Sequence, residues 1–238
     1  VASLKLDLAE ALAMNPDTLK ESLEAFEQAY RDAPDDELAP RALYNAAFSA
    51  LQLNESQHAI ELATEFLKKF PSDTLAPDVR FVKAESQLLL GDAAGASGLF
   101  KELVENSDPG DMQQRPIWIV RAATALNTAG RTNDTIAMLK KEADQLPEKS
   151  QRAEAQLLLG QAYLMAGNAA DSAKAFRASH EADPSWPRAS EALLMSGQAL
   201  FASGDSRSAQ AAWSTIIEED PNSRMADQAR FKLAQLAS

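Results

Sequence analysis

The sequence predicts an all-α protein, a right-handed α-solenoid of about six helix pairs followed by a C-terminal capping helix. Three observations carry this prediction. Alanine supplies 46 of the 238 residues, whereas glycine supplies 9 and aromatic residues only 6%, and such usage favours helix over sheet. Apolar residues recur at helical spacing. Residues that end helices recur with a period near 37 residues, which indicates an internal structural repeat.

Two kinds of helix-ending residue define each repeat. Prolines that follow apolar, helix-period stretches are 37 or 38 residues apart, at Pro34, Pro71, Pro109, Pro147, Pro184 and Pro221. Between them, residues that tolerate the left-handed conformation of a helix end are 37 to 39 residues apart, at Asn54, Gly91, Gly130, Gly167 and Gly204. Each repeat therefore reads as helix, tight turn, helix, proline.

These signals divide the chain into repeats within one predicted domain, residues 1–238. The expected repeats are approximately 1–35, 36–72, 73–110, 111–148, 149–185 and 186–222, with the capping helix at 223–238. The segment Leu4–Met14 is either a further capping helix or the degenerate first helix of a pair, because Glu10 stands where a small residue belongs. The chain starts at Val1 without an initiator methionine, so it is either a mature protein or an excised segment.

Small residues recur on the first helix of each pair, seven positions before the turn. They are Ala47, Ala84, Ala123, Gly160 and Gly197, with Ala234 in the same relation in the last helix. A constantly small position predicts the close approach of another helix backbone. The residues four positions later, which include Leu164 and Phe201, are predicted to continue a buried stripe. On the second helix, the core residue nine positions after the turn is large in most repeats, as in Phe100, Phe176 and Trp213.

This pattern resembles the tetratricopeptide repeat family over nearly the whole chain. One of the best copies is Leu159-Gly160-Gln161-Ala162-Tyr163 with Gly167, Phe176 and Pro184. The linkers after the prolines are longer than the common family period allows, and a polar residue in each is expected to cap the next helix. Such linkers resemble those of bacterial envelope proteins, such as the Tol-Pal cell-division coordinator and the outer-membrane β-barrel assembly lipoprotein. The resemblance favours a bacterial periplasmic or outer-membrane-associated location, with the cytoplasm as the alternative.

Composition excludes several functional classes. Lys and Arg number 23 against 35 Asp and Glu, a net charge of −12, which argues against nucleic acid or an anionic membrane surface as a partner. Cysteine is absent, so no disulfide or cysteine-ligated metal site can form. No apolar run approaches the length of a membrane span. The two histidines, His58 and His180, are far apart in the repeat order and are expected at the surface or at the rim of a groove, so no catalytic site, metal or cofactor is expected.

The remaining candidate for function is the surface of the first helices, which line the concave face of a helix-pair solenoid. Outward positions there predict a groove for a partner peptide or helix. The predicted groove residues are Arg41, Asn45, Phe48, Val82, Glu85, Leu89, Arg121, Thr124, Glu154, Leu158, Gln161, Met165, Met195 and Gln198. Leu89, Leu158, Met165 and Met195 are interpreted as an adaptable apolar strip, although burial between neighbouring repeats explains such residues equally well.

The sequence thus favours a non-catalytic scaffold that binds a protein or peptide. One alternative is self-association through an unpaired terminal repeat. Another is a regulatory or recruiting part of a larger enzyme whose catalytic domain lies outside Val1–Ser238. The family members that clamp a carboxyl terminus use repeated Lys, Asn and Arg. Because only Arg41, Asn45 and Arg121 are of that kind and acidic residues separate them, that ligand is not expected.

Overall fold

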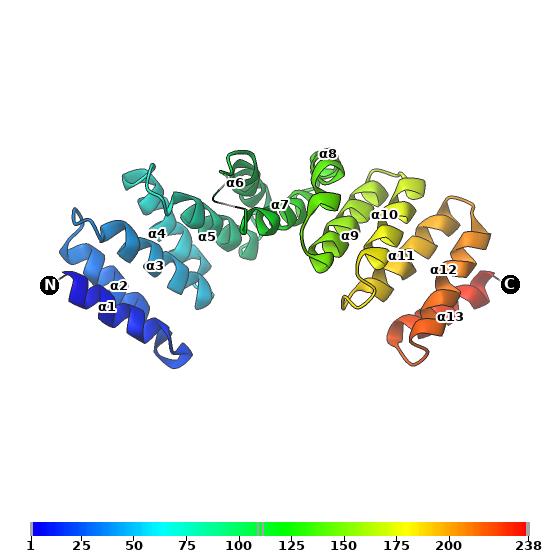
Figure 1. Ribbon diagram of the computed structural model, residues 1–238, viewed down its shortest axis with the longest axis horizontal. Coiled ribbons are helices and arrows are strands. Elements are labelled where there is room, and N and C mark those ends of the chain that lie inside the picture. Colours follow the sequence, from blue (N-terminus) through cyan, green and yellow to red (C-terminus); the bar gives the residue numbers. More distant parts are fainter. Residues whose placement is uncertain (1, 109, 111, 237–238) are drawn as a thin grey trace. The chain divides into compact units, whose positions relative to one another are not determined.

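A computed structural model describes residues 2–108, 110 and 112–236, and these residues form thirteen α-helices and no strand (Figure 1). Two compact units, residues 1–110 and 111–238, make up the chain. The N-terminal unit contains α1 (Ala2–Ala13), α2 (Leu19–Asp32), α3 (Ala39–Gln52), α4 (Ser56–Lys69), α5 (Ala76–Leu89) and α6 (Ala93–Glu105). The C-terminal unit contains α7 (Arg115–Thr128), α8 (Thr132–Glu142), α9 (Lys149–Met165), α10 (Ala169–Ala182), α11 (Ala189–Ala202), α12 (Ser206–Glu219) and α13 (Arg224–Leu236).

Consecutive helices pack against each other within each unit, so the predicted all-α class and helix-pair organisation are confirmed. Odd-numbered helices are the first helices of the pairs and even-numbered helices are the second helices. Short 3₁₀ segments, η1 (Pro16–Thr18) and η3 (Ala143–Gln145), precede α2 and follow α8. The handedness of the solenoid and its organisation as one domain stay predictions.

The predicted turn residues all have left-handed backbone conformations. Asn54 has a φ of 60°, and the four glycines have φ values between 70° and 91°. In each turn the amide of the next residue donates to a carbonyl five positions back, as Asp205 N does to Leu200 O at 2.9 Å. This pattern is the Schellman motif, which satisfies the carbonyls at a helix end. The local requirement for positive φ therefore explains why glycine or asparagine recurs there.

The proline signals mark the ends of the second helices. α2, α4, α10 and α12 each end two residues before a proline, and η3 ends two residues before Pro147. Pro109 lies outside the described residues. The prediction that a polar linker residue caps the next helix is confirmed for α13, where Ser223 Oγ accepts a hydrogen bond from Ala226 N at 3.1 Å. It is wrong for α3, α5, α7, α9 and α11, which have no side-chain cap. In the linkers before α3 and α5, an aspartate side chain instead accepts a backbone amide within the linker itself, as Asp36 Oδ1 does from Leu38 N at 2.9 Å.

Two of the small first-helix positions, Gly160 and Gly197, pack against large side chains of the second helices. A Cβ atom on Gly160 would lie 2.5 Å from Phe176 Cδ1, and one on Gly197 would meet the Trp213 indole. The expected close approach of a helix backbone is therefore corrected, because an aromatic ring occupies the space over each glycine. Ser172 Oγ also donates to Gly160 O at 2.8 Å, which pins α10 to α9.

The two ends of the chain depart from this packing in different ways. α1 packs against α2, so Leu4–Met14 belongs to the first helix of a pair, and Phe26 on α2 is buried. At the other end, Ala234 occupies the small position of α13 but is exposed. Phe231, three residues earlier, is 61% exposed. α13 is thus a first helix whose packing surface is open in the described part of the chain.

We expect Gly160→Ala and Gly197→Ala to destabilise the protein by about 1–3 kcal/mol each, because the added methyl group overlaps a buried ring. Gly98→Ala on α6 is the matched control, since a Cβ atom there has nothing within 4 Å. This control should leave stability unchanged or raise it by up to about 1 kcal/mol, because alanine favours helix. Thermal unfolding monitored by circular dichroism measures the stability of all three variants. Equal unfolding temperatures for the wild type and both core variants would contradict the packing described.

An ion pair between a half-buried arginine and a buried glutamate joins the start of α7 to the end of α8. Arg115 Nη1 and Nη2 donate to Glu142 Oε2 and Oε1 at 2.9 and 3.0 Å. The Glu142 side chain is 7% exposed. The hydrogen bonds and charge of the Arg115 guanidinium lower the pKa of the Glu142 carboxyl group against the opposing effect of burial. Two parallel hydrogen bonds of this kind give a geometrically specific contact.

Because the pKa of Glu142 is lower in the folded protein than in the unfolded chain, the ion pair stabilises the fold above about pH 4.5, the ordinary glutamate value. That stabilisation is lost as the pH falls through the folded pKa. We expect Glu142→Gln to lower the free energy of unfolding by about 1–3 kcal/mol at pH 7, and the difference from wild type to shrink at pH 3. Urea unfolding at both pH values measures this, with the exposed Glu148→Gln as control. A difference that is the same at pH 7 and pH 3 would refute the assignment.

Candidate functional site

The first helices form one layer within each unit. α3 contacts α5 in the N-terminal unit, and α7, α9, α11 and α13 contact one another in order in the C-terminal unit. Within each unit, a second helix packs against the first helices on both sides of it, as α4 does against α3 and α5 and α10 does against α9 and α11. The side of this layer that faces away from the second helices, called the first-helix face below, is where the predicted groove residues were placed.

In the N-terminal unit, part of the predicted groove is engaged in holding α1. Phe48 and Leu89 are 39% and 58% exposed. Arg41 Nη2 donates to Glu10 Oε2 at 2.8 Å, and Asn45 Nδ2 donates to Glu10 Oε1 at 3.4 Å. Glu10, the residue that breaks the small-residue pattern, thus links α1 to α3. Arg41 and Asn45 have a structural role whatever else they contact.

Two predicted groove residues are buried, which corrects their placement on an accessible surface. Val82 is 1% and Leu158 is 7% exposed. Val82 belongs to the core cluster of the N-terminal unit. Asn127 Nδ2 on α7 donates to Leu158 O on α9 at 2.9 Å. Because α3 contacts α5 and α7 contacts α9, a side chain between neighbouring first helices is covered, and the alternative of burial between repeats holds for both residues.

The other predicted groove residues are accessible to different degrees. Thr124 Oγ1 donates to Val120 O at 2.9 Å, so this hydroxyl is satisfied within α7. Met165 is 56% exposed. Gln198 is exposed, as Met165 is. The predicted groove residues that are half-buried are Glu85, Arg121, Thr124, Glu154, Gln161 and Met195.

Two adjoining hollows lie where α11 meets α13, and Gln198 and Lys232 line both of them. The first has a volume of about 290 Å³ and is completed by Phe201, Trp213, Gln235 and Leu236. The second has a volume of about 360 Å³ and is completed by Arg224, Asp227, Gln228 and Phe231. The residues of both hollows are called the α11–α13 seam below.

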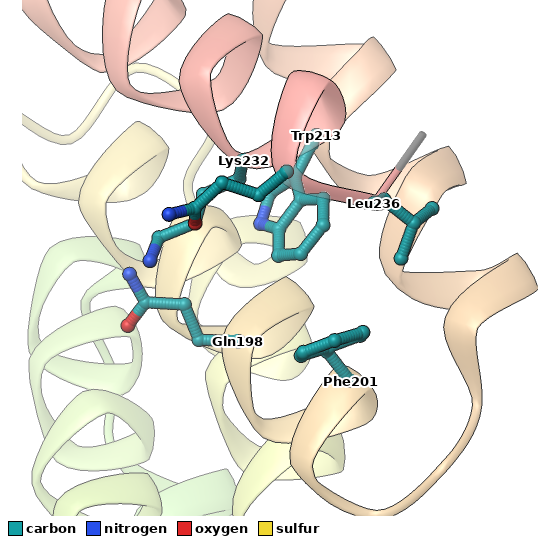
Figure 2. Close-up of a pocket in the computed structure, with 6 residues that line it drawn as sticks. Gln198, Phe201, Trp213, Lys232 and Leu236 are labelled. Carbon is teal, nitrogen blue, oxygen red and sulfur yellow. The ribbon is translucent and has the colours of Figure 1, made fainter. Parts of the chain in front are cut away.

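The first hollow has a polar end and an apolar end. In Figure 2, Gln198 and Lys232 extend to one side of the Trp213 ring, and Phe201 and Leu236 lie on the other. Phe201 is 52% exposed, and its ring centroid lies 6.3 Å from that of Trp213. Trp213 Nε1 donates to Leu194 O at 3.4 Å, so its polar atom is already satisfied. The seam therefore offers apolar ring surface beside amide and ammonium groups.

Comparison with protein families identifies the repeat. A tetratricopeptide repeat model matches residues 44–111 and 121–187, more than half of the chain, and a second tetratricopeptide repeat model matches residues 191–223. The chain belongs to the tetratricopeptide repeat family. No curated protein sequence matches it. The envelope-protein subtype and the location expected from the long linkers stay predictions.

Solved structures share the fold of this tetratricopeptide repeat protein at low sequence identity. YrrB, described as a TPR protein with an unusual peptide-binding site, is 18% identical with a TM-score of 0.64, covering 87% of this chain and 98% of its own. PilW, a type IV pilus biogenesis factor, is 17% identical with a TM-score of 0.63, covering 95% and 97%. Acl4, an assembly chaperone of RpL4, is 12% identical with a TM-score of 0.64, covering 99% and 97%. These likenesses establish the fold alone.

The sequence predicted only some of the residues that line the α11–α13 seam of this repeat protein. Gln198 is the one predicted groove residue that lines the hollows. Phe201 and Leu164 were expected in the buried stripe but are 52% and 45% exposed, which corrects that expectation. Lys232 and Gln235 stand 37 residues after Met195 and Gln198, so extending the list of outward positions by one repeat would have found them.

Both histidines of the repeat protein lie close to glutamate side chains. His58 Nε2 lies 2.6 Å from Glu27 Oε1. His180 is only 8% exposed, with Nε2 3.4 Å from Glu219 Oε1, so the expectation of a surface position is wrong for it. Across residues 2–108, 110 and 112–236, no three metal-ligating side chains are grouped. No helix in the described ranges is both long enough and apolar enough to cross a bilayer.

Proposed function

We propose that this protein is a non-catalytic scaffold that captures a peptide segment or helix of a partner protein on its first-helix face. The α11–α13 seam is the observation that carries the proposal. It combines open aromatic surface at Phe201 with polar groups at Gln198 and Lys232 that form no hydrogen bond or ion pair within the described residues. Binding sites commonly join a mostly apolar hollow to a few polar groups that orient the ligand.

The family and its structural neighbours support this proposal. Tetratricopeptide repeats are interaction modules, and fold alone does not supply a chemistry. YrrB is described as having a peptide-binding site, and Acl4 is described as an assembly chaperone. Both uses depend on holding another polypeptide, which is the activity that we propose for this chain.

Physical differences between the two helix layers favour the first-helix face. Met165 and Leu89 expose flexible or apolar surface there, and methionine adapts to varied partners. The second helices instead expose long charged side chains such as Lys68, Lys174 and Glu218. Ordering such side chains costs conformational entropy, and desolvating their charges costs free energy. A partner therefore binds with less cost on the first-helix face.

Self-association is a second candidate, supported by apolar side chains at both ends of the chain. Leu4 and Leu8, one helical turn apart on α1, are 75% and 61% exposed, and Phe231 on α13 is 61% exposed. Exposed apolar surface of this kind favours association. Sedimentation velocity over a hundredfold range of protein concentration tests this candidate, and a single monomeric species throughout would reject it.

Site-specific photocrosslinking tests the scaffold proposal. We expect p-benzoylphenylalanine at Gln161, Met165 or Gln198 to yield covalent adducts with the same partner protein in the source cell. The same amino acid at Lys140 or Lys174, on second helices, should yield far fewer adducts because those positions face away from the first-helix layer. Mass spectrometry identifies the adducts, and circular dichroism confirms that each variant is folded. Equal adduct yields from both helix layers would contradict the proposal.

A further inference from the structure

We infer that the α11–α13 seam recognises an acidic peptide segment that carries one bulky apolar side chain. This inference rests on the proposed scaffold function and names the chemistry of the partner at this one place. The apolar side chain enters the hollow beside Trp213, and carboxylates on either side of it pair with Lys232 and Arg224.

The seam presents cations without carboxylate partners. Within the described residues, neither Lys232 nor Arg224 forms an ion pair. Asp227 is the acidic residue among those lining the hollows, and Arg230 Nη1 holds its Oδ1 at 2.8 Å. Arg230 Nη2 also donates to Pro221 O at 2.7 Å, which fixes it on α13. The two remaining cations are therefore available to carboxylates from outside.

The corresponding seam one repeat earlier, between α9 and α11, is built differently. Met195 and Pro187 stand there in place of Lys232 and Arg224, 37 residues before them. The position of Phe231 is taken by Leu194, which is 5% exposed. The cationic and open character of the α11–α13 seam is thus a particular feature of this place and not a property of every repeat.

The hollow suits one apolar side chain. Its volume of about 290 Å³ is at the small end of the range for ligand pockets. Trp213 is only 2% exposed, and its indole nitrogen donates to Leu194 O, so its ring lies at the wall of the hollow and leaves no orphaned donor there. Phe201 and Leu236 complete the apolar end. An aromatic or leucine side chain buried there removes the exposed ring of Phe201 from water.

The distribution of charge along the chain agrees with an acidic partner at this unit. Residues 1–110 contain nine Lys and Arg against twenty Asp and Glu, a net charge of −11. Residues 111–238 contain fourteen against fifteen, a net charge of −1. Long-range repulsion of an acidic segment is therefore weak in the C-terminal unit. Local attraction by Lys232 and Arg224 can then decide the binding position.

A nuclear magnetic resonance titration of the ¹⁵N-labelled protein tests the inference. The probe is a seven-residue peptide, blocked at both ends, with a central phenylalanine flanked by three glutamates on each side. We expect the Trp213 indole signal, assigned with Trp213→Phe, to shift with a saturable dependence on peptide concentration. The indole signals of Trp118 and Trp186 should stay in place, because neither residue lines the hollow. Affinity should fall as salt is raised, because the ion pairs are exposed.

Matched variants separate the charged and apolar contributions. Lys232→Glu should weaken binding about fivefold or more, since it replaces an attraction with a repulsion. Lys149→Glu, an exposed charge reversal in the same unit but outside the seam, should leave affinity unchanged. Phe201→Ser should also weaken binding, and its exposed position makes loss of folding easy to exclude by circular dichroism. Peptides with serine for phenylalanine, or with glutamine for glutamate, should bind more weakly than the probe.

Several results would overturn the inference. They are equal binding by wild type and Lys232→Glu, equal loss with Lys149→Glu, or equal binding of the glutamine peptide. A concentration-dependent dimer that Lys232→Glu disrupts would assign the seam to a second copy of the chain and would also overturn it. If the peptide fails to shift Trp213 while first-helix photocrosslinks persist, the scaffold function stands and the proposed chemistry of the seam is wrong.

Discussion

Phe176 and Trp213 lie over Gly160 and Gly197, and this contact between a large second-helix side chain and a small first-helix residue fixes the geometry of the α9–α10 and α11–α12 pairs. The two partners are always 16 residues apart. That spacing holds only if the turn between the helices keeps its length, which the left-handed glycine and the Schellman hydrogen bonds ensure. Inserting one residue in the turn would rotate the ring away from the glycine by about 100°, the rotation per helical residue.

The candidate site follows from the point where this packing stops. α13 has the sequence pattern of a first helix, but Ala234 carries no second-helix side chain and is exposed. Lys232, rather than an apolar residue, stands beside α11 at the next seam position. The hollow between α11 and α13 is therefore left open instead of being closed by a side chain such as Met195.

Local features of the fold could be predicted from the sequence, because they depend on the conformation of single residues. Gly91 and its equivalents were identifiable since few other residues adopt positive φ. The burial of Val82 and Leu158 could not be derived, because it depends on how closely neighbouring first helices pack. Likewise, Phe201 shares its repeat position with the half-buried Leu88. Leu164 has the same repeat position and is exposed as well, so the degree of burial there depends on the neighbouring repeat and not on the residue type alone.

Contacts between residues far apart in the sequence could not be predicted from the sequence either. Nothing in the repeat pattern connects Arg115 with Glu142, because their side chains meet only when the helix pair is assembled. Glu10 appeared as a defect in the first repeat, yet it accepts hydrogen bonds from both Arg41 and Asn45. The sequence shows that the charged Glu10 stands where the pattern has a small residue. The residues that Glu10 contacts can be identified only from the three-dimensional structure.

Simple energetics indicate how the seam would cooperate with the rest of the first-helix face. Burying one large apolar side chain contributes about 1.5–3 kcal/mol. Two exposed ion pairs add about 0.2–1 kcal/mol each. The total of a few kcal/mol corresponds to dissociation constants near or above the millimolar range. One seam can therefore select an acidic segment with an apolar anchor without holding it tightly.

Tight capture of a partner requires further contacts on the same chain, and Met165 on α9 exposes apolar surface in the same unit. Linked weak contacts raise affinity through effective concentration, so the seam would set which segment binds and the remaining face would set how long it stays.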